Sequence, residues 1–173
     1  MQLKEVRAQL RRFAKEVIKQ ARTNLTRKKK VVTRELYNSL EYQLNETPDA
    51  INVDFFMEDY GLFQDKGVSG KKVKYGTPYS YTTKMPPPSA LDKWIVRRNI
   101  KGIRDKKGKF IKRKNLQFMI ARSIFMKGIK PTLFFTKPFE RYYDKLRTDL
   151  PRQFAADTEN SWKFLFNTEK GNE

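Results

Sequence analysis

The stretch LKEVRAQLRRFAKEVIKQARTNLTR, from Leu3 to Arg27, decides the fold class. Its apolar residues recur three and four positions apart, which predicts one amphipathic helix whose other faces are strongly basic. The helix should end in the basic run at 27–30, so we expect a basic N-terminal helix over residues 1–30. The apolar stripe consists of Leu3, Val6, Leu10, Phe13, Ala14, Val17, Ile18, Ala21 and Leu25.

Outside this helix, the sequence predicts a small antiparallel sheet. In the segment 51–57, INVDFFM, apolar residues alternate with mostly polar ones, the pattern of a strand with one buried face. Residues 31–44 fit either a strand or a short helix, and a turn is expected at 45–49. The segment TLFFT at 132–136 lies between two prolines and predicts an edge or closing strand. These patterns predict an α+β fold whose sheet packs with two or more helices and whose C-terminus is helical.

The remaining segments complete this outline. A length of 173 residues predicts a single domain. Residues 59–88 are rich in Gly and Tyr and predict a long interface loop, while residues 101–114 predict a basic hairpin or loop. A helix from Asn115 to Gly128 should follow. A C-terminal helical segment is expected over residues 139–168, with an interruption at Pro151.

Charge is the strongest compositional signal. The chain carries 38 Lys and Arg against 19 Asp and Glu, a formal net charge of +19, and it has no His. Such a field attracts polyanions; because no base-reading motif is present, we expect contact with phosphate backbones. A solvated basic surface is the alternative. The residues expected to face DNA or another polyanion are Lys71, Lys72, Lys74, Lys101, Arg104, Lys106, Lys107, Lys109, Lys112, Arg113 and Lys114.

Residue types exclude most catalytic sites. Without Cys or His, disulfides, thiolate metal sites and the usual hydrolase triads cannot form. Pro48-Asp49 and Asp105-Lys106-Lys107 match a nuclease motif weakly, because its second half falls in a predicted glycine turn. We therefore expect no catalytic residues, metal, cofactor or enzymatic activity. A Mg²⁺ site is conceivable, although solvated surface acids are the commoner case, from the carboxylates Asp54, Glu58, Asp59 and Asp65.

Hydropathy gives no sign of a membrane segment. No apolar run approaches the about 20 residues that a span needs, and the N-terminal residues are charged, so we expect neither secretion nor a span. The absence of Cys is compatible with synthesis in a reducing cytoplasm.

Aromatic residues gather in the predicted loop and beside the prolines. Tyr side chains could stack on bases, but Tyr with Pro and Gly is equally typical of protein interfaces, which we favour. The residues expected at a subunit interface are Tyr60, Phe63, Tyr75, Tyr79, Tyr81, Phe134, Phe135 and Pro138.

Two separated motifs carry a family resemblance. The first is Tyr60-Gly61-x-Phe63-x-Asp65-Lys66-Gly67-Val68-x-Gly70. The second runs from Ile120-Ala121-Arg122-Ser123-Ile124 through Lys127-Gly128-Ile129-Lys130-Pro131 to Phe134-Phe135. Over residues 35–143 the chain resembles the neck and tail-completion proteins of tailed bacteriophages.

This resemblance implies a non-enzymatic virion protein of the neck or tail, made in the host cytoplasm. It implies a ring of about six or twelve copies between the capsid portal and the tail. Portal or adaptor proteins and tail proteins would be its partners, and the ring would surround the channel for packaged double-stranded DNA. The long segment 101–114 departs from shorter family members and leaves a specialised neck or tail-tube role open.

Two other functions stay open at this point. A stand-alone basic nucleic-acid-binding protein should be monomeric or dimeric and bind DNA with a steep salt dependence. A metal-dependent nuclease is the third class, and plasmid nicking with Mg²⁺ would reveal it.

Overall fold

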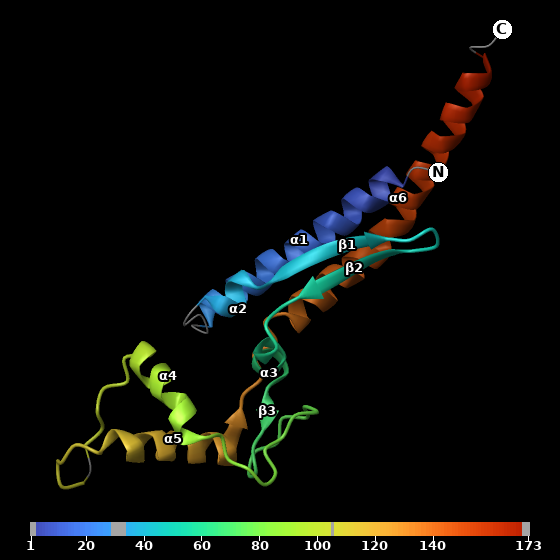
Figure 1. Cartoon of the computed structure of the whole chain (residues 1–173). Coiled ribbons are helices and arrows are strands. Elements are labelled where there is room, and N and C mark those ends of the chain that lie inside the picture. Colours follow the sequence, from blue (N-terminus) through green and yellow to red (C-terminus); the bar gives the residue numbers. More distant parts are fainter. Residues whose placement is uncertain (1–2, 29–33, 105, 171–173) are drawn as a thin grey trace. The chain divides into compact units, whose positions relative to one another are not determined.

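The computed structural model describes residues 3–28, 34–104 and 106–170, with side chains up to Lys163 in the last helix. The α+β fold is confirmed: a long N-terminal helix, small antiparallel sheets and a helical C-terminus (Figure 1). The chain forms two compact units. The first unit comprises residues 1–27, 37–57 and 134–173, and the second comprises residues 28–36 and 58–133. Each unit is assembled from segments that are distant in the sequence. The sequence therefore has no linker between the two units, and it predicts a single domain.

Helix α1, Lys4–Arg27, forms where the apolar stripe predicts it. The predicted residues from Val6 to Leu25 are buried, and Asn24 joins them because its Nδ2 donates to the carbonyl oxygen of Phe134 at 3.2 Å. A polar residue on the buried face is stable there because its amide has a partner.

Strands β1, Glu41–Glu46, and β2, Ile51–Phe56, form a two-stranded antiparallel ribbon. The strand expected from Ile51 is confirmed, and the ambiguous residues before it divide into the short helix α2, Glu35–Asn38, and β1. Residues 31–33 lie outside the described ranges. Alternation leaves one ribbon face half-buried and the other exposed, as expected for a sheet covered on one side.

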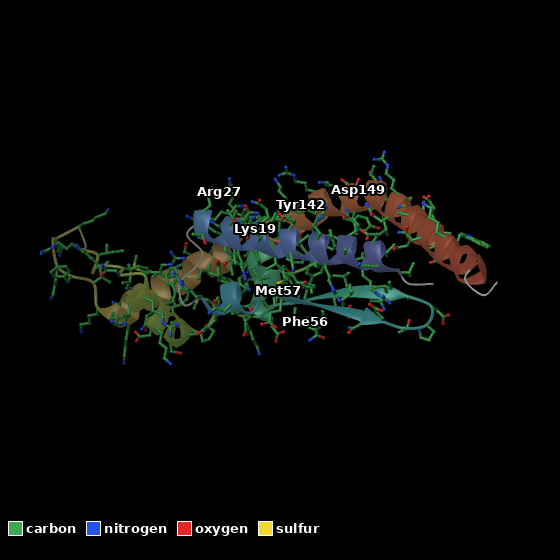
Figure 2. All side chains as sticks on the ribbon, turned by 90° about the horizontal axis from the view of Figure 1, so that it is seen from above. Lys19, Arg27, Phe56, Met57, Tyr142 and Asp149 are labelled. Carbon is green, nitrogen blue, oxygen red and sulfur yellow. The ribbon has the colours of Figure 1, made fainter. Side chains whose placement is uncertain are left out.

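Helix α6, Thr136–Lys170, corrects two expectations. The TLFFT strand is wrong: Leu133 has a positive φ of 50°, and its N–H donates to the carbonyl oxygen of Asp65 at 2.9 Å. Pro138 instead lies in the first turn of α6, where a missing N–H breaks no helical bond. The interruption at Pro151 is also wrong, since the helix continues through it and bends near Asp149 (Figure 2).

Aromatic side chains from three elements make the core of the first unit. The ribbon and α6 lie on either side of α1 (Figure 2). Phe55 of β2 packs against aromatic rings of α1 and of the segment where α6 begins. Its ring centroid is 5.9 Å from Phe13, 5.4 Å from Phe135 and 5.9 Å from Phe139, all in edge-on arrangements. Each such pair adds about 0.5 to 1.5 kcal/mol beyond area burial. The inner ribbon face is therefore fixed against both helices.

The second unit is built from short elements. They are α3 Tyr60–Lys66, β3 Val68–Ser69, the 3₁₀ helix η1 Pro88–Leu91, α4 Asp92–Arg97, α5 Arg113–Lys127 and β4 Gly128–Ile129. Helix α3 and strand β3 lie inside the segment expected to be a loop at 59–88, and α5 begins two residues before the expected Asn115 cap. The predicted stop at Gly128 is confirmed by its φ of 77°.

Candidate functional site

The two motifs of the sequence resemblance meet in a close backbone crossing. β3 pairs antiparallel with β4, so that Ser69 lies opposite Gly128. A Cβ at Gly128 would lie 2.1 Å from the carbonyl oxygen of Val68, and one at Gly70 would lie 2.4 Å from the N of Gly128. Only glycine allows backbones to approach this closely. The motif glycines are therefore needed for the crossing, whatever its function.

The crossing also holds the Tyr-rich segment beside α3. Ser69 of β3 accepts from the N–H of Tyr81 at 2.9 Å and donates its own N–H to the carbonyl oxygen of Tyr79 at 2.8 Å. Phe63 of α3 packs edge-on against Tyr79, with ring centroids 4.6 Å apart. These contacts bring Tyr60, Phe63, Tyr79 and Tyr81 around one open pocket of about 580 Å³, which we call the aromatic pocket.

The aromatic pocket is mostly apolar with a few polar groups. Burial raises the pKa of Tyr81 and of Tyr60, and the N–H of Leu36, which donates to the Tyr60 hydroxyl at 3.0 Å, partly offsets the rise for Tyr60. Gln64 also lines the pocket, and its Nε2 is buried with no hydrogen-bond partner among the described residues. A bound segment that offers a carbonyl oxygen beside an apolar side chain would suit this combination.

Residues 101–104 and 106–112 form a basic, largely exposed hairpin that leads into α5, so the last two residues of the segment predicted at 101–114 belong to the helix. Arg104 pairs with Phe110 in an antiparallel bridge, and Ile111 donates its N–H to Ile103 at 2.8 Å. The Arg104 guanidinium carbon lies 4.0 Å from the Phe110 ring centroid, and its Nη1 donates to the carbonyl oxygen of Gly108 at 2.8 Å. Arg104 is exposed, yet it stiffens the hairpin through this cation–π contact.

Arg113, at the base of this hairpin, also has an internal partner. Its Nε donates to Asp92 of α4 at 2.6 Å, and this hydrogen bond holds the pKa of the Asp92 carboxyl below its usual value. Arg104 and Arg113 organise the hairpin, and its exposed lysines are the groups that we expect to meet a polyanion. These lysines are Lys101, Lys106, Lys107, Lys109, Lys112 and, in the first turn of α5, Lys114.

The other basic residues expected to face DNA lie elsewhere in the second unit. The N–H groups of Lys71 and Lys72 donate to the carbonyl oxygens of Phe125 and Met126, at the C-terminal end of α5, both at 2.9 Å. The hairpin joins the opposite end of this 15-residue helix, about 22 Å away. Lys71, Lys72 and the nearby exposed Lys74 therefore form a second basic patch, separate from the hairpin.

The aromatic residues near the prolines serve the core instead of an exposed interface. Phe134 is fully buried, Pro138 is buried, and Phe135 packs in the aromatic core of the first unit. This corrects their sequence assignment, because only surface residues can contact another subunit without unfolding. Tyr75 is half-buried and donates its N–H to Ser69 Oγ at 3.0 Å, outside the aromatic pocket.

The carboxylates considered for a metal do not assemble. No cluster of three or more acidic residues suitable for a metal ion exists within the described ranges. Asp54 accepts from Asn45 across the ribbon at 2.6 Å, whereas Asp65 is buried in α3 of the second unit. Pro48-Asp49 belongs to the first unit and Lys106-Lys107 to the second, and Asp105 lies outside the described residues.

Sequence reasoning missed an apolar surface on α5. Phe118 and Met119 are both 49% exposed, while Leu116 and Ala121 are buried. Apolar residues surround this helix on all sides, which is a signal of contacts on more than one face. Trp94 and Val96 of α4 are exposed in the same unit.

Comparisons with known proteins found no match to a protein family, a curated protein or a solved structure. Among the helices of the described residues, none combines the length and the apolar character needed to cross a bilayer.

Proposed function

We propose that this chain is a structural virion subunit of a tailed bacteriophage, part of a ring in the neck or at the tail-completion position. The observation that carries the proposal is the interlocking of the two motifs. Their glycine crossing supports the aromatic pocket, whose exposed rings resemble the anchors of protein interfaces. Both motifs thus serve one surface suited to a protein neighbour. The neighbours proposed are further copies of this chain, portal or adaptor proteins and tail proteins.

The basic hairpin supports contact with packaged DNA in this proposal. Its lysines are exposed and carry no base-reading geometry, so they would neutralise phosphates without selecting a sequence. Each phosphate contact adds about 0.9 to the slope of log affinity against log salt on duplex DNA. A channel wall needs only such weak contacts, because the genome must pass along it.

The assembly proposal is tested on virions of the source phage. Native mass spectrometry of gently disrupted particles should find this chain in a fixed-stoichiometry complex with portal or tail proteins. A matched variant, Phe63→Ala, should reduce its incorporation into particles, whereas Phe154→Ala on α6, where the ring is 52% exposed, should not. Absence of the chain from purified virions would refute the proposal.

The hairpin also favours a second candidate function, a stand-alone nucleic-acid-binding protein. Replacing Lys106, Lys107 and Lys109 by Gln removes three exposed charges from the hairpin, and replacing Lys71, Lys72 and Lys74 by Gln removes the same charge from the other patch. If the hairpin carries DNA binding, its variant lowers the salt slope by about 2.7 and the other variant does not. Tight, salt-sensitive binding by a monomer that is missing from virions would favour this second function.

A further inference from the structure

Acidic and basic residues are unevenly distributed along this chain, although its net charge is strongly positive. Between Arg34 and Lys66 the sequence holds eight of its 19 acidic residues and no Lys or Arg. Four of the eight, Glu41, Glu46, Asp49 and Asp54, lie in the ribbon of the first unit and its turn. Helix α1 of the same unit is strongly basic, yet a single ion pair, Arg7 to Glu46 at 2.7 Å, joins it to the ribbon among the described residues. One unit therefore carries two surfaces of opposite sign that are largely unpaired.

The acidic surface ends in a rigid turn, residues 46–50, which we call the acidic turn. The N–H of Thr47 donates to the carbonyl oxygen of Ala50 at 2.8 Å, and the N–H of Ala50 donates to Thr47 Oγ1 at 3.1 Å. Every residue of the turn is exposed, including Glu46 and Asp49. The turn is thus ordered before any contact forms, which lowers the entropy lost on binding.

The basic surface contains a groove between α1 and the start of β1, which we call the basic groove. Its volume is about 800 Å³ and its floor includes Ile18 and Leu40. Arg22 fixes one wall, because its guanidinium donates to the carbonyl oxygens of Tyr37 and Leu40, both at 3.0 Å. The cations at its rim are Lys15, Lys19 and Arg27, which form no ion pair within the described ranges. One carboxylate, Glu41, also lines the groove, but the cations outnumber it and the lining keeps a net positive charge.

The turn and the groove lie at opposite ends of the ribbon. Figure 1 shows the turn beside the start of α1, while the groove lies beside the later part of α1, where β1 begins. Strands of six residues separate the two sites by about 20 Å. The acidic turn of one copy therefore cannot enter its own basic groove. Complementary sites at opposite ends of one body are the arrangement that a head-to-tail contact requires.

We propose that the acidic turn of one copy binds in the basic groove of a second copy. This inference rests on the proposed function, since it names a contact that would join neighbours in the ring. Asp49 would face Lys15, Lys19 and Arg27, and Pro48 would lie toward the apolar floor. Because the contact is heterologous, it closes into a ring if its rotation allows and otherwise extends.

Site-specific disulfide trapping tests this contact in the full chain, which has no Cys of its own. Thr23→Cys places a thiol in the groove and Ala50→Cys places one in the turn, and neither change removes a charge. The control is Thr148→Cys on α6, because Thr23 and Thr148 are both exposed and both donate to a carbonyl oxygen four residues earlier. One variant of each mixture is isotopically labelled, so that mass spectrometry distinguishes heterodimers from homodimers.

We expect the groove and turn variants to give about tenfold more heterodimer than the control and turn variants at low salt. Lys19→Glu in the groove variant should abolish the excess, and adding Asp49→Lys to the turn variant should restore it. Equal yields from both mixtures, or no rescue by the double reversal, would overturn the inference. If the disulfide does not form but the chain is found in virion rings, the inference is refuted and the proposed function stands. If the disulfide forms but the chain is absent from virions, only the proposed function is refuted.

Discussion

Asp157→Ala tests how the two long helices of the first unit are joined. Asp157 of α6 is 2% exposed, and its carboxylate accepts two hydrogen bonds from the first turn of α1. Oδ1 accepts from the N–H of Glu5 at 3.0 Å, and Oδ2 accepts from the N–H of Val6 at 2.9 Å. One helix thus supplies the N-terminal cap of the other, with an anion at the positive end of the helix dipole.

The size of the effect follows from this geometry. A net hydrogen bond to a charged group contributes about 1.5 to 3 kcal/mol, and loss of a helix cap costs about 0.5 to 2 kcal/mol. The two N–H groups share one carboxylate and regain water at the helix end, so we expect Asp157→Ala to lower the free energy of unfolding by about 2 to 4 kcal/mol. Asp157→Asn keeps one acceptor oxygen and should cost about half as much.

Urea unfolding followed by far-ultraviolet circular dichroism measures these differences. Asp149→Asn is the matched control, because it removes the same charge from α6 and affects only a long 3.4 Å contact with Gln9. We expect the control to cost less than about 0.5 kcal/mol. Amide hydrogen exchange should also show lost protection in the first turn of α1 for the Asp157 variants alone. Equal unfolding midpoints for Asp157→Ala and Asp149→Asn would refute the capping argument.

Three further predictions concern the second unit. Gly128→Ala should destabilise the chain by more than about 4 kcal/mol, since its Cβ would meet the β3 backbone, whereas Gly76→Ala, at a φ of 66° in open space, should cost about 1 to 2 kcal/mol in urea unfolding. Tyr60→Phe leaves an N–H of α2 without its acceptor and should cost about 1 kcal/mol. Because folding raises the pKa of Tyr60, the stability contributed by its neutral phenol is complete below about pH 10 and is lost as pH rises through the folded pKa. Tyr60→Phe has no phenol to ionise, so it should lose less stability than the native chain in alkaline melts. Asp92→Asn breaks the exposed pair with Arg113, and because folding lowers the pKa of Asp92, its small stabilising effect should be present above about pH 4 and vanish as pH falls through the folded value. An acid titration in which both proteins lose stability in parallel would contradict this.

Local pattern predicted the regular elements of the first unit well. The stripe of α1 and the alternation of β2 each report a single periodic surface, so burial follows directly from spacing. Local sequence patterns gave wrong predictions where a contact with a distant segment determines the backbone conformation. The TLFFT segment has strand composition, yet Leu133 bonds to the backbone of Asp65 and the chain then enters α6. Pro151 is tolerated because helix packing on both sides of it outweighs one lost hydrogen bond.

The candidate surfaces divide in the same way. The basic composition of 101–114 indicated an exposed charged segment, but the cation–π contact that stiffens it depends on strand pairing. Tyr60, Phe63, Tyr79 and Tyr81 were predicted from the sequence to lie at an interface, and the structure brings them around one pocket, whereas it places Phe134 in the core. The acidic stretch between Arg34 and Lys66 can be read from the sequence, but the net charge does not reveal it because it is a sum over the whole chain.

The sequence alone determined the α+β class, the amphipathic α1, the ribbon strand and the basic surface, since each depends on the spacing or charge of neighbouring residues. The tertiary structure alone decided which distant segments meet. Asp157 caps a helix that begins more than 150 residues earlier, and the glycines of two motifs cross at one point. Such contacts arise from the packing of complete elements, and no local periodicity encodes them. The same packing separates the acidic turn from the basic groove by the length of the ribbon.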